Sequence, residues 1–218
     1  MFLTPAGILI SLLLLSWQLP CIANTLAVGQ PVIKLVFEYA RQQEDPSADT
    51  LFYANERKLR LEDFMGTPSF RGPSAAVAYT SFAYDGSSLI KKDTLFIFLR
   101  LQVFFVKSAS WVRTDARDDY TLAHEQLHFD ITLLVAERFK QKLRQTALNR
   151  DDYDSIIQYQ YLQSFREMNR LQYAFDQETN HGLDKAAQLQ WQDKVRAALK
   201  NHGTFPEELG YDDYFQAF

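Results

Sequence analysis

The sequence predicts an α+β fold in which a small N-terminal β-sheet is followed by a helical half. Two observations lead to this prediction. Up to about residue 112, short segments rich in Val, Ile and Phe alternate with Gly, Pro and Asp turn residues, as in strands. From about Asp119 onward, apolar residues recur at spacings of three, four and seven, which is the period of an amphipathic helix. Strands first and helices afterwards are typical of α+β domains.

Length and composition indicate one globular domain, which we expect over residues 24–218. Of the 218 residues, 47% are hydrophobic and 23% are charged, as in an average soluble domain. The net charge is −4, and Lys and Arg are interspersed with Asp and Glu, so no basic surface for nucleic acid is expected.

A cleaved N-terminal signal peptide is predicted over residues 1–23. Its apolar core, residues 6–17, is too short for a membrane span but suits the hydrophobic region of a leader, and Pro20 ends it. Cys21 and Ala23 supply the small residues that precede a cleavage site, which we place directly after Ala23. The chain is therefore expected to be secreted or periplasmic, with no stable membrane insertion after cleavage.

Two alternatives to cleavage are an uncleaved anchor and a lipoprotein acylated at Cys21. The lipoprotein is disfavoured because Pro20, rather than a small residue, precedes the cysteine. Cleavage after Ala23 leaves no cysteine in the mature chain. An exported protein without disulfides must be stabilised by its core or by a metal.

Strands are expected over residues 31–40, 76–88 and 93–112. The last of these is apolar on both faces and is expected to lie at the centre of the sheet. Asp85-Gly86 is a turn dipeptide and is expected to end the second strand. Residues 57–76 contain Gly66, Pro68, Gly72 and Pro73 and are expected to form an irregular loop.

Three helices are expected in the second half. The first runs from Asp119 to near Arg144, where basic residues accumulate. The second covers residues 151–182 and the third residues 184–203, each closing at a glycine. The aromatic tail, residues 205–218, is expected to be a docked irregular segment.

The first helix contains the motif His-Glu-x-x-His, formed by His124, Glu125 and His128. Positions four apart lie on one helix face, so both imidazoles can reach one ion at the zinc–nitrogen distance of about 2.0–2.1 Å. Glu125 lies about 100° around the helix, where it can reach a water molecule on the metal. The pattern predicts a Zn²⁺ site in which Glu125 is the general base.

The plain alternative is that both histidines are ordinary helix residues. Three observations count against it: the motif lies inside an independently predicted helix, only four histidines occur in the chain, and the apolar face continues unbroken after the motif. The motif is therefore expected to face the core.

A catalytic zinc site needs a third protein ligand. No third histidine follows His128 at the metzincin spacing, so the donor is expected from the end of the second helix. His181 is the favoured third ligand, with Glu178 as its rival. Asp176 is expected to orient a ligand or to replace it. The plain alternative is a polar helix end whose histidine faces the negative pole of the helix dipole.

Four stretches resemble the bacterial family named domain of unknown function 922, described as predicted secreted zinc-dependent proteases related to the zincin-like metallopeptidases. They are RKLRLEDFMGTP at 57–68, SAAVAYTSFAY at 74–84, HEQLHFDI at 124–131 and YAFDQETNHG at 173–182. The resemblance implies a zincin-like fold and a secreted zinc metalloprotease. It implies nothing about the substrate preference.

The leading functional hypothesis is a zinc-dependent metallopeptidase that hydrolyses peptide bonds in a protein or peptide substrate. The alternative is a non-catalytic envelope protein with a structural zinc that binds a partner through its helical half. That alternative requires a fourth protein ligand, whereas an enzyme requires an open position and a cleft.

Overall fold

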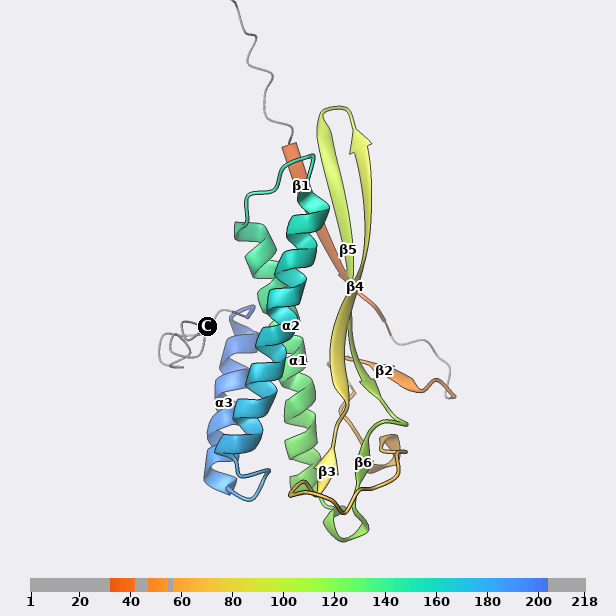
Figure 1. Cartoon of the computed structure of the whole chain (residues 1–218), viewed down its shortest axis with the longest axis vertical. Helices are drawn as coiled ribbons and strands as arrows, with labels where there is room; N and C mark the ends of the chain where they lie inside the picture. Colours follow the sequence, from red (N-terminus) through yellow and green to blue (C-terminus); the bar gives the residue numbers. More distant parts are fainter. Residues whose placement is uncertain (1–31, 42–46, 55–56, 204–218) are drawn as a thin grey trace, which may run out of the picture. The chain divides into compact units, whose positions relative to one another are not determined.

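Strand β5 (Thr94–Val106) organises the sheet (Figure 1). β4 (Thr80–Lys91) pairs with it antiparallel along its whole length. On its other side, β1 (Val32–Tyr39) runs parallel to its first half, and β2 (Thr50–Phe52) pairs antiparallel with its end. The predicted central position of this segment is confirmed. The computed structural model describes residues 32–41, 47–54 and 57–203, so the expectations for residues 1–23 and 205–218 lie outside the described residues.

Among the described residues, the helices cover one face of the sheet. Alternate residues of β5 are buried, namely Leu95, Ile97, Leu99, Leu101, Val103 and Phe105. The opposite face carries Phe96 and Phe98, whose rings stack on each other, and Phe98 is 37% exposed. The apolar residues of β5 therefore form a ring pair on this opposite face as well as part of the core.

The expected turn at Asp85-Gly86 is wrong. Both residues lie inside β4, opposite Arg100 and Leu99 of β5. The chain reverses instead at Lys92, which has a left-handed backbone with φ 56°. Strand pairing continues to the end of β4, and this pairing overrides the local turn preference of the dipeptide.

A second, two-stranded sheet lies beside the long one. It pairs β3 (Ala76–Val77) antiparallel with β6 (Trp111–Val112). Most of residues 57–75 is irregular, as predicted, apart from the 3₁₀ turn Leu61–Asp63, and a second 3₁₀ turn covers Thr114–Ala116.

The three predicted helices are present: α1 (Asp119–Gln145), α2 (Tyr153–Glu178) and α3 (Lys185–Lys200). Asp118 caps the N-terminus of α1, because its side chain accepts a hydrogen bond from the Thr121 N–H. Asp184 caps α3 in the same way, through Ala186 and Ala187. α2 was expected to close at Gly182, but it ends four residues earlier, at Glu178, and Thr179 is its C-cap.

α1 lies at the centre of the fold, in contact with the sheet and with both other helices (Figure 1). Its buried side chains, including Ile131, Val135 and Phe139, join those of β5 in one hydrophobic core. The architecture is α+β, as predicted. In the part of the chain that the structure describes, every helix is too short or too polar to cross a membrane.

Candidate metal centre

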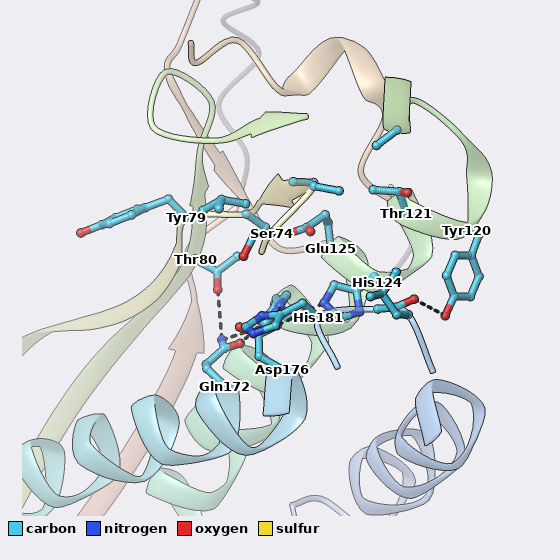
Figure 2. Close-up of a pocket in the computed structure, with 18 of the residues that line it drawn as sticks. Ser74, Tyr79, Thr80, Tyr120, Thr121, His124, Glu125, Gln172, Asp176 and His181 are labelled. Carbon is cyan, nitrogen blue, oxygen red and sulfur yellow. Dashed lines mark hydrogen bonds and ion pairs between the residues drawn. The ribbon is translucent and has the colours of Figure 1, made fainter. Parts of the chain in front are cut away.

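The predicted motif lies in the second and third turns of α1, on its buried side. His124 is 5% exposed and Glu125 is 2% exposed, so the expectation that the motif faces the core is confirmed. Nε2 of each histidine lies close to α2. Asp176 lies there in the last turn of the helix, near His124 (Figure 2). Asp176 Oδ1 is 3.2 Å from His124 Nε2 and 3.1 Å from His128 Nε2. Two helices thus bring three metal-ligating atoms to one point.

This spacing is compatible with a bound metal ion such as zinc. Ligands at about 2.0–2.2 Å around a tetrahedral centre lie roughly 3.3–3.5 Å from one another, close to the observed separations. The potential ligand atoms of the three residues all lie within 4.8 Å of one another. Among the described residues, this is the one group of His, Cys, Asp or Glu side chains that meets this condition. Imidazole and carboxylate donors are those that zinc accepts in catalytic sites.

Two glutamines hold the imidazole rings. Gln188 Oε1 lies 3.0 Å from His124 Nδ1, and Gln172 Oε1 contacts His128 Nδ1. The amide of Gln172 is fixed because its Nε2 donates to the His128 carbonyl and to Thr132 Oγ1, each at 3.0 Å. An amide oxygen only accepts, so each histidine carries its proton on Nδ1. Each Nε2 is then left with a lone pair unless a second proton binds there.

The two Nε2 atoms and the Asp176 carboxylate are therefore stabilised by a positive charge between them. Two Nε2 lone pairs that face one carboxylate oxygen repel it, and the repulsion is relieved either by protonation of the rings or by a cation between them. A divalent ion bound by His124, His128 and Asp176 satisfies all three groups without extra protons.

The electrostatics of the metal-free site follow from this arrangement. Burial alone would lower the pKa of His128, but the Asp176 carboxylate and the Glu125 charge raise it to about 9. Burial alone would raise the pKa of Asp176, but its hydrogen bonds from His124 and His128 hold it well below its usual range.

A pH dependence of stability follows for the zinc-free protein. The pKa of His128 rises from 6.5 to about 9 on folding, so its contribution is complete below pH 6.5 and is lost as the pH rises toward 9. The melting temperature of chelator-treated protein should fall across this interval. Asp176→Asn removes the main partner that raises this pKa and should flatten the profile. Parallel profiles for the two proteins would contradict the assignment.

Glu125 is the second buried acid of the site. The backbone N–H of Ala78 donates to its carboxylate, while Oε2 is buried and has no hydrogen-bond partner within the described ranges. Burial raises the pKa of Glu125, opposed by the charges of His128 and His124. Figure 2 shows Glu125 between His124 and the pocket wall that contains Ser74 and Thr80. A desolvated carboxylate in a pocket is suited to proton transfer.

The other two predicted ligands, His181 and Glu178, are not part of this group. His181 lines the same pocket but is not part of the group formed by His124, His128 and Asp176. Glu178 Oε2 accepts a hydrogen bond of 2.7 Å from Trp191 Nε1 of α3. Asp176, expected to orient or replace a ligand, is the residue that the structure places against both histidines.

Sequence reasoning missed the two glutamines. Gln172 lies four residues before Asp176 and so on the same face of α2, a spacing that could have pointed to it. Gln188 belongs to α3, and no pattern in the sequence connects it with His124. Its position depends on how α3 packs against α1.

The site opens into a cavity of about 560 Å³. Residues 74–80, side chains of α1 and α2, and residues 181–183 line this cavity. Cavities of this volume are typical of ligand-binding sites.

No family model, curated protein or solved structure matches this chain. The resemblance to domain of unknown function 922 therefore depends on the quoted motifs and stays a prediction.

Proposed function

We propose that this protein is a zincin-like zinc metallopeptidase that acts outside the cytoplasm, as the leader over residues 1–23 predicts. The observation that carries the proposal is the convergence of His124 Nε2, His128 Nε2 and Asp176 Oδ1 beside a buried glutamate, at the edge of a cavity. His-Glu-x-x-His on a helix is the ligand-and-base arrangement of metalloproteases.

Zinc would be held by His124, His128 and Asp176. When bound, zinc lowers the pKa of a water molecule to about 7 and polarises a carbonyl group. The Gln172 and Gln188 amides keep both rings oriented toward the ion, because each accepts the Nδ1 proton.

Glu125 would transfer the proton. Its carboxylate accepts a proton from the attacking water and gives it to the nitrogen of the leaving amine, so that the C–N bond breaks without release of an unstable amide anion. Among the described residues Oε2 has no hydrogen-bond partner, so no such bond has to break before this exchange.

A strand in the pocket wall supports an extended peptide as the substrate. β3 forms part of the pocket wall, and among the described strands its one partner is β6. A strand with an unpaired edge can bind a peptide through its main chain. The neighbouring side chains Ser74, Ala75 and Ala78 are small and line the pocket together with β3.

The alternative with a structural zinc needs a fourth protein ligand. Within the described ranges the group contains three residues, and their shared pocket opens to a cavity. These features favour a catalytic site over a closed structural one.

Metal removal tests the proposal. Treatment with 1,10-phenanthroline should abolish hydrolysis of fluorescein-labelled casein, and stoichiometric Zn²⁺ should restore it. The melting temperature should fall on removal of zinc and recover with it, because ligation energy contributes to folding. Casein turnover that withstands complete removal of zinc would refute the proposal.

A further inference from the structure

The turn after α2 has an unusual backbone. Asn180, His181 and Gly182 are all left-handed, with φ values of 49°, 55° and 85°. Glycine adopts this conformation freely, but two preceding non-glycine residues adopt it at a conformational cost. Such strained segments persist only where the surrounding structure holds them, and they cluster at functional sites.

The chain provides its own comparison. The tripeptide Asn-His-Gly recurs at residues 201–203, after α3. There His202 and Gly203 are left-handed, with φ values of 54° and 84°, but Asn201 has an ordinary φ of −93°. His202 is exposed and does not line the pocket. The same three residues can therefore end a helix without the additional strain found at Asn180.

Contacts with the candidate metal centre hold the first turn in place. The His181 N–H donates to the Asp176 carbonyl at 2.7 Å, and the Tyr120 hydroxyl donates to the Gly182 carbonyl at 2.7 Å (Figure 2). A Cβ atom on Gly182 would lie 3.2 Å from His124 Nδ1, so glycine allows the backbone to pack on this ring.

The imidazole of His181 lines the cavity, yet its Nδ1 is buried and has no hydrogen-bond partner in the part of the chain that the structure describes. A buried polar atom without a partner is costly and uncommon in a folded protein. Glu125 Oε2 is in the same state in the same pocket. His181 is outside the group of potential ligand atoms, which leaves this nitrogen for a partner other than the metal.

We propose that His181 is a catalytic residue that donates a hydrogen bond to the carbonyl oxygen of the scissile peptide bond as negative charge develops there. This inference rests on the proposed function. When water attacks, a C–O bond forms and the π electron pair of the carbonyl moves to its oxygen. His181 keeps its proton and stabilises that charge. When the carbonyl forms again, the C–N bond breaks and the amine nitrogen takes the proton carried by Glu125.

The turn itself supplies sharp variants. His181→Gly removes the ring and suits the left-handed backbone, so the fold should be retained. His181→Asn also tolerates this backbone, and it keeps an N–H donor near the position of Nδ1. His202→Gly is the matched control, because it makes the same change in the same tripeptide away from the pocket.

All three variants should bind zinc stoichiometrically and melt no lower than the wild type. On fluorescein-labelled casein, kcat of His181→Gly should fall by about 10²–10³-fold, as for loss of an oxyanion donor, with KM nearly unchanged. His181→Asn should recover at least about tenfold of that loss if it restores part of the hydrogen bond. His202→Gly should match the wild type.

The possible failures are distinguishable. Loss of zinc from His181→Gly would make His181 a ligand and overturn this role. An unchanged kcat, a change in KM alone, or equal losses in the Gly and Asn variants would also overturn it. With an active, zinc-dependent wild type, these results leave the proposed function intact. A wild type that binds zinc but cleaves no casein refutes the proposed function and this inference together.

Discussion

Glu125→Gln is expected to lower kcat on fluorescein-labelled casein by about 10²–10⁴-fold, the usual contribution of a general base. Gln keeps the shape of the side chain and can still accept the hydrogen bond from the Ala78 N–H, but it cannot take a proton from water. Zinc content should be unchanged, since Glu125 is not in the ligand group.

The same variant should melt at or above the wild-type temperature. Burial of the Glu125 carboxylate, with Oε2 unpartnered, opposes its ionisation, and the neutral amide avoids that cost. Glu62→Gln, at an exposed position, is the control and should have no effect on turnover or melting. Normal turnover by the zinc-loaded Glu125→Gln protein would remove Glu125 from the mechanism.

Asp176→Asn should weaken zinc binding more than the change of a residue that only orients a ligand, which typically costs about ten- to hundredfold in affinity. The amide is uncharged and no longer balances the ion between His124 and His128. Competition with a fluorescent zinc chelator measures the affinity. Casein hydrolysis should fail at zinc concentrations that saturate the wild type.

Glu178→Gln is the matched control, two residues further along α2. Its amide oxygen can still accept the Trp191 N–H, so folding should be retained. Zinc affinity should equal that of the wild type. Loss of zinc from Glu178→Gln, with Asp176→Asn unaffected, would show that the carboxylate was assigned to the wrong residue.

The part of the site that the sequence could predict lies within one helix. The i, i+4 spacing of His124 and His128 determines that their side chains share a face, and the apolar residues that follow determine that this face is buried. These relations need no knowledge of other elements. The three helices could be predicted for the same reason, because each has its own periodicity. The central strand could be predicted from its apolar run, which is also local.

A third candidate ligand could not be chosen this way, because the side chain that approaches both histidines depends on how α2 packs against α1. His181 was favoured for its imidazole and its position before a glycine. The structure instead places Asp176, still inside the helix, opposite both histidines. The left-handed turn beyond Thr179 gives His181 another position in the pocket. Its three positive φ values arise from tertiary contacts such as that of Tyr120 with Gly182.

A crystal structure of the zinc-loaded protein, with anomalous data at the zinc edge, tests the central claim most directly. It should show one ion bound by His124 Nε2 and His128 Nε2 at about 2.0–2.1 Å and by an Asp176 oxygen at about 2.0–2.2 Å, with a further position not occupied by protein. The absence of zinc, a nitrogen of His181 in place of Asp176, or a fourth protein ligand that closes the site would contradict it.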